Sequence, residues 1–457
     1  MINRIFFFCF VCISMCVGFT IHAQTTIVHC ANDIFLQQTA QQNPTLNSQI
    51  THLNTRLNAA SISNARTTTT IPLPADTVIT IPVVVHIIHN NSDNSIGGAN
   101  ISDAQIQSQI DVLNKDYRRK NADTANAPSV VNAVGADVKL NFCLATIDPN
   151  GNATNGITRT YSSQASFIYP TDETTVKALS YWPSNQYLNI WVCNLFLYNT
   201  TQVLLGITQL PGGDTLSGLT AGDGNALTDG VLVNYQSFGT SGTLLAQYAL
   251  GRTVTHEIGH WFGLSHPWGN YNSGDCTLSD YCNDTPVCGD PFYAAAPSCN
   301  TNTFANNPPV NCSDRRMFEN FMEYSDDGCM NVFTKDQKTR MRLTLVLSPR
   351  RLALLSANNH CNASTTATKA PVVSSGLFMN IFPNPATEII TIQTNFSSTQ
   401  KLDYKIYNTM GQFVYDSQEQ NPSDGMKQIS LSGYASGVYF IQVSDGSQQI
   451  VKRIVKL

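Results

Sequence analysis

The strongest chemical signal in the sequence is one short pattern, H-E-x-x-H-x-x-G-x-x-H, which begins at His256. Residues four apart share one face of a helix, so His256 and His260 are placed to bind one metal ion, with Glu257 beside its open side. Gly263 is able to adopt a positive φ angle and end the helix, which returns His266 toward the same point. Three imidazoles leave the fourth tetrahedral position of zinc to water, which is the arrangement of a catalytic zinc site.

This pattern also predicts a reaction. A single histidine on a helix is more often a satisfied polar group than a metal ligand, but the combination of three histidines, a glutamate and a glycine rarely arises by chance. Zinc in such a site polarises a scissile carbonyl and acidifies water, while Glu257 takes the proton as general base and returns it to the leaving amine. We therefore predict peptide-bond hydrolysis without a covalent intermediate.

The composition limits the partners of this chain. It has 457 residues, of which 42% are hydrophobic and 12% are charged, and its formal net charge is -5. This length permits two or three domains with a substantial core. The slightly acidic balance gives no electrostatic reason to expect nucleic acid or an anionic membrane as a partner.

The N-terminal residues predict export. Residues 1–23 contain an early arginine, an apolar core and a small residue, Ala23, at the end, which is the pattern of a secretory signal peptide. No later apolar run approaches the length of a membrane span, so we expect a secreted or cell-surface protein without a stable span. Residues 24–66 are polar and precede the first strong strand, and we interpret them as a pro-segment.

Strand-like and helix-like segments alternate in residues 67–361, which we assign to the peptidase domain. Ile81–His89 is a continuous apolar run typical of a buried strand, and Leu140–Ala145 and Tyr187–Cys193 are further strands. Ser102 is placed to cap a helix between the first two of these strands. This order predicts an α/β fold with a twisted mixed sheet backed by helices.

The extended histidine pattern resembles that of the metzincin clan of metallopeptidases. Gly251–Thr255 before it, and Trp261, Phe262 and Leu264 within it, resemble the pappalysin family more narrowly. The resemblance implies a mixed sheet with a backing helix, a zinc-binding active-site helix and an irregular, disulfide-rich C-terminal subdomain. It also implies that Asp229–Tyr235 is the edge strand against which an extended substrate lies. A plain core strand is the alternative.

The resemblance assigns roles to three residues downstream. Met322 is similar to the methionine turn beneath the zinc, and Tyr324 to a tyrosine that hydrogen-bonds the developing oxyanion. Asp327 resembles the acid at the base of the pocket for the side chain after the scissile bond, where a carboxylate selects arginine or lysine. Since Arg66 ends the pro-segment, we expect autolytic maturation between Ala65 and Arg66.

Latency is expected to depend on Cys30, the only cysteine of the pro-segment. A thiolate is a good fourth zinc ligand, so Cys30 is able to replace the catalytic water until the segment is removed. Asp33 is the rival blocking ligand, because pro-segments of the metzincin clan use either residue type. An ordinary disulfide between Cys30 and Cys361 is a further alternative.

Cysteines are concentrated between residues 276 and 329, which in an exported protein indicates disulfide bonds. The resemblance implies two of them, Cys276–Cys312 and Cys299–Cys329. To these we add two pairs of our own, Cys282 with Cys288 and Cys143 with Cys193. This assignment leaves Cys361 without a partner in the catalytic region, and the sequence does not fix the connectivity.

Carboxylates recur in the same stretch, at Asp275, Asp280, Asp284 and Asp290. Clustered carboxylates bind calcium through hard oxygen ligands, or merely favour tight turns. The order of Asp280, Asp284 and Thr285 after a cysteine resembles the calcium loop of the pappalysin family. The resemblance implies a structural calcium ion held by these three residues.

The C-terminal part predicts a separate domain. Residues 362–376 have the composition of a linker, and residues 377–457 contain alternating strand-like segments that predict an all-β sandwich. The motifs F-P-N-P at Phe382, S-G-V-Y-F at Ser436 and the terminal K-R-I-V-K-L resemble the C-terminal sorting domain of the type IX secretion system. The resemblance implies passage through the outer membrane by that machinery. A carbohydrate- or protein-binding sandwich is the alternative.

Together these patterns predict a secreted, zinc-dependent endopeptidase that is made as a latent zymogen and acts as a monomer on protein or peptide substrates. The alternative from another class is an exported adhesin that uses the metal for structure. Glu257 argues against the adhesin, because a structural site does not require a carboxylate beside an open coordination position.

Overall fold

The computed structural model of the chain divides into two compact units, Met1–Ser364 and Thr365–Leu457. The residues it describes are 26–36, 55, 77–211, 226–269, 274–295, 299, 310–312, 314–355, 358–361, 379–382, 386–394, 396, 401–408, 413–420, 426–445 and 449–456. The predicted signal peptide, the predicted linker and most of the pro-segment, including Arg66, lie outside the described residues.

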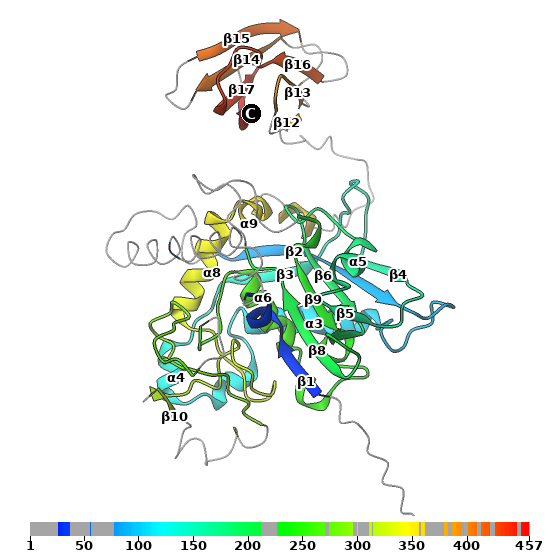
Figure 1. The fold of residues 1–457 in the computed structure, drawn as a ribbon, viewed down its shortest axis with the longest axis vertical. Helices are drawn as coiled ribbons and strands as arrows, with labels where there is room; N and C mark the ends of the chain where they lie inside the picture. Colours follow the sequence, from blue (N-terminus) through cyan, green and yellow to red (C-terminus); the bar gives the residue numbers. More distant parts are fainter. Residues whose placement is uncertain are drawn as a thin grey trace, which may run out of the picture. The chain divides into compact units, whose positions relative to one another are not determined.

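The first unit is built on one sheet of nine strands (Figure 1). Seven of them follow in the order β3 (Leu140–Leu144), β2 (Ile79–His89), β6 (Leu188–Cys193), β9 (Val231–Asn234), β8 (Gln202–Thr208), β7 (Leu195–Leu197) and β5 (Phe167–Tyr169). In addition, β4 (Ile157–Tyr161) pairs with β2, and β1 (Thr26–Cys30) pairs with β8. The strands from β3 to β9 run parallel to their neighbours, whereas β8 is antiparallel to β9, so the prediction of a mixed sheet is confirmed.

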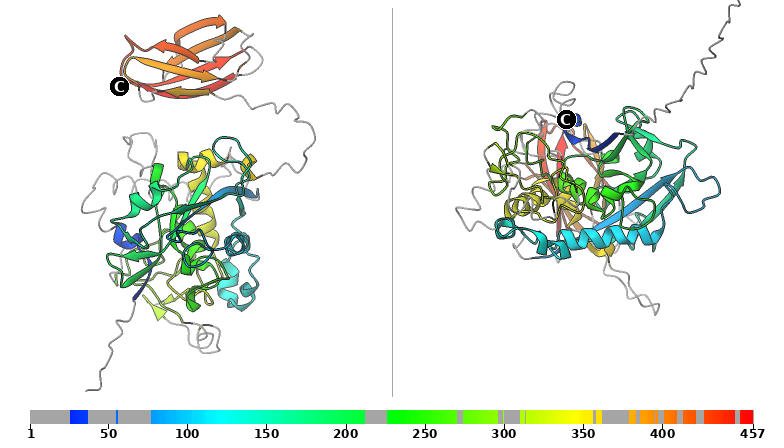
Figure 2. Two further views of the ribbon diagram at one scale, coloured as in Figure 1. Left: turned by 90° about the vertical axis from the view of Figure 1, so that its right-hand side faces the viewer. Right: turned by 90° about the horizontal axis from the view of Figure 1, so that it is seen from below.

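Apolar side chains cover both faces of this sheet. On one face, Val83, Val85 and Ile87 of β2 belong to a core cluster with residues of α3 (Asp103–Asp116) and α6 (Arg252–Trp261). On the other face, Ile88 belongs to a second cluster, together with Val176 of α5 (Glu173–Ala178). Figure 2 shows α3 (cyan) running along one side of the sheet. The continuous apolar run of β2 follows from this burial on both faces.

Helix α3 forms where the sequence predicted it. The Ser102 hydroxyl accepts a hydrogen bond from the Gln105 backbone N–H at 3.2 Å, which caps the first turn. Ile106, Ile110 and Leu113 are buried in the core cluster beside α6. Helix α3 therefore packs against α6 in the core, as expected for the backing helix of the predicted fold.

Strand β9 does not lie at the edge of the sheet. It lies between β6 and β8, and all of its residues are buried, so the expectation that Asp229–Tyr235 is the edge strand is wrong. The strand that contacts α6 and pairs with β1 is β8; β1 runs along it in parallel register, with Cys30 opposite Gly206. The two strands have equally apolar sequences, so only the pairing of distant strands distinguishes them.

Helix α9 (Pro349–Leu354) fixes the C-terminal end of α6 through a buried ionic contact. Asp229 accepts hydrogen bonds from Arg351 at 2.6 Å and from the Trp261 indole N–H at 2.9 Å. The guanidinium of Arg351 also lies 3.7 Å from the Trp261 ring centroid. The arginine charges lower the pKa of Asp229 despite its burial, which keeps this contact ionised.

The remaining elements of the first unit are short helices and strands, apart from α8. They are η1 (Ala122–Asn126), α4 (Ser129–Val134), η2 (Ala226–Thr228), η3 (Tyr235–Ser237), η4 (Ala246–Tyr248), β10 (Val310–Asn311), β11 (Asp314–Arg315), α8 (Lys335–Leu347) and η6 (Asn358–Cys361). Among the helices that the structure describes, none is long and apolar enough to cross a membrane.

The disulfide pattern corrects two of the sequence-based assignments, Cys143 with Cys193 and Cys282 with Cys288. Cys276 is bonded to Cys312 and Cys299 to Cys329, as the resemblance implied. Cys143 is bonded to Cys361, not to Cys193, across a sequence separation of 218 residues. Cys193 is buried in the sheet as a free thiol, and Cys282 and Cys288 are also free and buried rather than paired. The partner of Cys143 comes from η6, which contacts β2, the neighbour of β3.

The second unit contains two antiparallel sheets, as the sequence predicted. The first has the order β12 (Met379–Phe382), β13 (Ile389–Thr394) and β16 (Met426–Ser430). The second has the order β15 (Phe413–Gln420), β14 (Lys401–Asn408), β17 (Gly437–Ser444) and β18 (Gln449–Lys456). One core cluster joins them, with residues such as Ile390 from one sheet and Ile441 from the other. This is the architecture of a β-sandwich.

Candidate active site

Helix α6 is ended by backbone geometry that turns the chain back on itself. Gly263 has a φ angle of 85°, which favours glycine, and its N–H donates to the His260 carbonyl at 2.8 Å. The Leu264 N–H donates to the Gly259 carbonyl at 3.0 Å. These bonds satisfy the last carbonyls of the helix and direct the following loop toward its own last turn. His266 is thereby brought beside His256 and His260.

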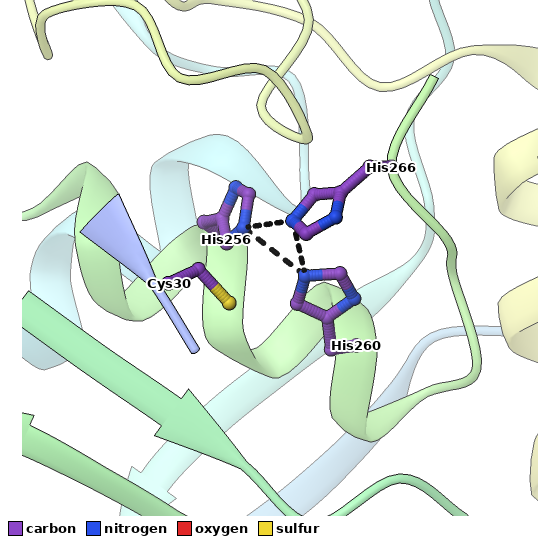
Figure 3. Close-up of side chains that lie close together, drawn as sticks. All are labelled: Cys30, His256, His260 and His266. Carbon is purple, nitrogen blue, oxygen red and sulfur yellow. Dashed lines mark hydrogen bonds between the residues drawn. The ribbon is translucent and has the colours of Figure 1, made fainter. Parts of the chain in front are cut away.

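The three imidazoles point at one centre (Figure 3). Their Nε2 atoms are 3.1 Å apart for His256 and His260, 3.0 Å for His260 and His266, and 3.2 Å for His256 and His266. Tetrahedral zinc with Zn–N bonds of about 2.05 Å requires separations of about 3.3 Å. The three rings therefore fit a zinc ion.

The other nitrogen of each ring is hydrogen-bonded to an oxygen atom. The Nδ1 atom lies 2.8 Å from the Phe321 carbonyl for His256, from the Leu264 carbonyl for His260, and from the Asp33 carboxylate for His266. These oxygens accept, so each Nδ1 carries the proton and each Nε2 presents a lone pair to the centre. Burial lowers the pKa values of His256 and His260, which keeps both rings neutral and able to bind a cation.

Cys30 completes the group from the pro-segment. Its thiol lies with the three histidines such that one ligand atom from each is within 4.8 Å of the others, and Figure 3 shows the sulfur directed toward the rings from β1. Within the described part of the chain, no other group of three or more histidine, cysteine or acidic residues converges in this way. The residue that the sequence analysis singled out therefore lies close to the three rings, and its role as the fourth ligand stays a prediction.

Glu257 lies beside this centre and is fully buried. No described residue hydrogen-bonds to either of its carboxylate oxygens at normal distance. Burial raises the pKa of Glu257 to about 8, and the nearby Cys30 and Thr208 side chains offset part of that effect. The backbone of β8 also approaches it closely, because a Cβ on Gly206 would lie 2.7 Å from the Glu257 Cγ. The carboxylate is thus confined between α6 and β8.

Tyr324 and Met322 lie around the same centre. The Tyr324 hydroxyl donates to the Cys30 carbonyl at 3.2 Å, and its ring centroid is 5.0 Å from that of His266. Met322 is fully buried and packs against Gly259, the glycine between the zinc-binding positions of α6. Both side chains thus lie at the site, and their roles as oxyanion donor and methionine floor stay predictions.

Asp327 lies in a pocket next to the metal centre, together with Tyr248, His256, Glu323 and Tyr324. One of its carboxylate oxygens accepts hydrogen bonds from the backbone N–H groups of Leu250 at 2.8 Å and of Arg252 at 3.1 Å. The other oxygen is buried and has no hydrogen-bond partner among the described residues. Burial raises the pKa of Asp327 to about 6. An incoming cation would favour its charged form.

Asp33 does not occupy the fourth position of the metal centre. Its carboxylate accepts from the His266 Nδ1 at 2.8 Å and from the Trp268 indole N–H at 3.1 Å. Asp33 therefore orients the His266 ring through the ring nitrogen that points away from the metal centre. This is a different contact from the blocking role considered for it from the sequence.

The predicted calcium residues lie close to one another. The Thr285 hydroxyl hydrogen-bonds to both carboxylate oxygens of Asp280, at 2.9 and 2.7 Å. Burial raises the pKa of Asp280 to about 7, and the charge of Asp284 adds to this effect. One oxygen of Asp284 is buried without a hydrogen-bond partner in the described chain. The calcium assignment stays a prediction.

Sequence reasoning missed several residues that contact the site. His29, beside Cys30, stacks on Tyr324 with ring centroids 5.0 Å apart, and its Nε2 lies 2.7 Å from the Tyr248 hydroxyl. The glycine inside β8, Gly206, was a usable signal, because a glycine within a strand often marks a close backbone approach. No comparable pattern in the sequence marks Glu323.

Gly259 provides a test of the packing beneath the zinc-binding helix. A Cβ at this position would lie 2.5 Å from the Met322 Sδ, so we expect Gly259→Ala to lower the free energy of unfolding by about 1 to 3 kcal/mol and to reduce metal content. Thermal unfolding and metal analysis measure these effects. In a Met322→Ala background, Gly259→Ala should lower the free energy of unfolding much less. An equal loss in both backgrounds would show that the added methyl group does not clash with Met322.

Comparisons with known proteins agree with this geometry. A family model described as Pregnancy-associated plasma protein-A, of the M43 peptidases, matches residues 171–346, and a secretion system C-terminal sorting domain matches residues 380–457. An extracellular metalloprotease of Colletotrichum graminicola is 30% identical over 264 residues, which are 58% of this chain and 75% of that protein. One of Verticillium alfalfae is 29% identical over 276 residues, 59% of this chain and 78% of that protein.

Two solved structures are also similar. A glutamate-to-alanine mutant of Tannerella forsythia promirolysin has a TM-score of 0.59 and 35% identity, and the match covers 74% of this chain and all (100%) of that one. Mature mirolysin in complex with a cleaved peptide has a TM-score of 0.53 and 40% identity, over 64% of this chain and 100% of that one.

The fold and the three-imidazole site define a zinc metalloendopeptidase of the metzincin type. The chain belongs to the pappalysin family of metallopeptidases, and it carries a type IX secretion sorting domain at its C-terminus. Both the sorting domain and the extracellular relatives support secretion or export to the cell surface.

Proposed function

We propose that this endopeptidase cleaves peptide bonds on the amino side of arginine or lysine, and that Glu257 and Tyr324 carry the chemistry. The observation that supports it most is the convergence of three lone-pair nitrogens beside a buried carboxylate that has no other described partner. A carboxylate buried without a partner is costly, so its retention at this position favours a catalytic role.

His256, His260 and His266 would hold the zinc ion. When bound, zinc supplies Lewis-acid polarisation of the scissile carbonyl and lowers the pKa of water. Glu257 would accept the proton of the attacking water and deliver it to the leaving amine. The Tyr324 hydroxyl, which donates to the Cys30 carbonyl, is positioned to donate instead to the oxyanion of a substrate.

The substrate is expected to lie along the edge of β8. The pro-segment strand β1 hydrogen-bonds to this edge in parallel, so removing it exposes main-chain donors and acceptors beside Glu257. A substrate in the opposite, antiparallel direction would use the same edge. Main-chain pairing of this kind accepts many sequences, which leaves selectivity to the side-chain pockets.

Asp327 supports the preference for a basic residue after the scissile bond. It lies in the pocket beside His256 and Tyr324, and one oxygen remains available for a cation. A charge-assisted hydrogen bond to arginine or lysine would satisfy that oxygen. The other side chains that line the pocket include apolar and aromatic ones, such as Leu205 and Tyr248, and a second acid, Glu323.

The pro-segment is proposed to keep the enzyme latent through Cys30. The thiol is directed at the position that water needs, and β1 covers the edge that substrate needs. His29 additionally lies in the pocket that contains Asp327. Because Asp33 lies behind His266, its contact favours Cys30 as the blocking ligand.

Maturation and calcium binding belong to the same proposal. Cleavage before Arg66 would release residues 24–65, including Cys30, and leave Arg66 in front of the peptidase domain 67–361. A calcium ion held by Asp280, Asp284 and Thr285 would stabilise the long loop region that follows α6, because hard oxygen ligands suit this cation.

A single assay tests the proposed activity. Mature enzyme is incubated with matched peptides that carry arginine, lysine, alanine or glutamate after the scissile bond, with and without a zinc chelator. We expect cleavage before arginine and lysine to be about 10-fold or more faster than before alanine, since a charged hydrogen bond contributes about 1.5 to 3 kcal/mol. Chelation should abolish all cleavage. Equal rates for the four peptides would refute the basic preference.

A further inference from the structure

Glu323 is a second buried acid in the pocket that contains Asp327. The side chains of both residues are buried, with 1% of each residue exposed. One carboxylate oxygen of each has no hydrogen-bond partner within the described residues. Buried polar atoms in native proteins nearly always have a partner, so two vacant oxygens in one pocket indicate a ligand that supplies donors to both.

Backbone donors hold both carboxylates in place through their other oxygens. Glu323 accepts from the Phe292 N–H at 3.1 Å and from the Tyr324 N–H at 3.4 Å. Asp327 accepts from the N–H groups of Leu250 and Arg252. The vacant oxygens are therefore presented by fixed side chains, as a preorganised binding site requires.

Two arginines whose charges act on the pocket acids, Arg316 on Glu323 and Arg252 on Asp327, are ion-paired with other carboxylates. The guanidinium of Arg252 is hydrogen-bonded to Asp116 at 2.5 Å and to Asp123 at 2.9 Å. Arg316 forms an ion pair with Asp290 and packs over the Phe292 ring, with 5.1 Å to its centroid. Burial outweighs these charges, and the pKa of Glu323 is raised to about 8. Among the described residues, no cationic side chain hydrogen-bonds to the vacant oxygen of either acid.

A guanidinium and an ammonium differ in how they meet two such acids. The guanidinium of arginine is planar and carries five N–H donors in a fixed fork, so it is able to bind two carboxylates at once. It also stacks on aromatic rings, and Tyr248 and Tyr324 line this pocket. The ammonium of lysine is a compact, strongly hydrated charge that one carboxylate satisfies.

We propose that Glu323 is a second specificity determinant, which together with Asp327 makes the pocket select arginine over lysine after the scissile bond. This inference rests on the proposed preference for a basic residue and refines it. His29 of the pro-segment lies in the same pocket, and its described hydrogen bond goes to Tyr248 rather than to either acid. The acids therefore remain available to a longer side chain.

The test compares kcat/KM of mature enzyme for two peptides that differ only in arginine or lysine after the scissile bond. We expect Glu323→Gln to lower kcat/KM for the arginine peptide about tenfold or more and to change the lysine peptide less than about threefold. Glu323→Asp withdraws the carboxylate while keeping its charge, and it should reduce the same ratio. Asp326→Asn is the matched control, because this neighbouring acid does not line the pocket, and it should leave the ratio unchanged.

The outcomes separate this inference from the proposed function. If Asp327→Asn abolishes the basic preference while both Glu323 variants keep the wild-type ratio of arginine to lysine, Glu323 has only a structural role and the inference fails alone. If the wild-type enzyme shows no preference for either basic residue, the proposed specificity and this inference both fail. A selective loss for arginine in either Glu323 variant supports it.

Discussion

Replacing Glu257 by glutamine in the mature enzyme should lower kcat by about 10²- to 10⁴-fold, because that is the usual contribution of a positioned general base. The amide has nearly the same shape but does not accept the proton of the attacking water. Because His256, His260 and His266 all keep their Nδ1 partners on other residues, metal content should stay at the wild-type level. Peptide hydrolysis and metal analysis on the same sample measure both quantities.

His260→Ala is the matched comparison for this prediction. It removes one ring nitrogen from the centre and should lose both metal and activity, whereas Glu257→Gln should lose activity alone. Glu257→Gln with near wild-type turnover would show that another group moves the proton. If Glu257→Gln loses metal, the Glu257 carboxylate is instead needed for metal binding.

Replacing Cys30 by alanine should activate the uncleaved precursor. The thiol is directed at the fourth position of the centre, so removing it opens that position to water. We expect an increase in peptide hydrolysis of about tenfold or more, which corresponds to losing a contact of about 1.4 kcal/mol or more. The precursor should carry Arg66→Ala, and gel analysis should show that it stays intact during the assay.

Two controls define the role of the thiol. Cys193→Ala removes another buried free thiol, one that lies in the sheet away from the centre, and should leave latency unchanged. Asp33→Asn weakens the contact behind His266 without opening the fourth position, so its precursor should remain less active than Cys30→Ala. A fully latent Cys30→Ala precursor would show that coverage of β8 by β1 is sufficient for latency.

Local sequence determined the metal-binding geometry. His256 and His260 are one helical turn apart. Gly263, with its positive φ angle, ends that helix, so the position of His266 also depends only on residues nearby in the sequence. The Ser102 cap and the strands of the C-terminal sandwich were also predictable, because capping and alternation are short-range patterns.

Tertiary structure alone decided which distant segments meet. The bond between Cys143 and Cys361, the interior position of β9, and the contact of Asp33 with His266 all join residues far apart in the sequence. Strand order and disulfide partners depend on how the whole chain closes, and apolar strands of similar composition are interchangeable until they are paired. The sequence by itself therefore predicted the metal centre and its chemistry, whereas the fold decided which thiol lies beside the centre, which strand β1 pairs with and which acids share the pocket.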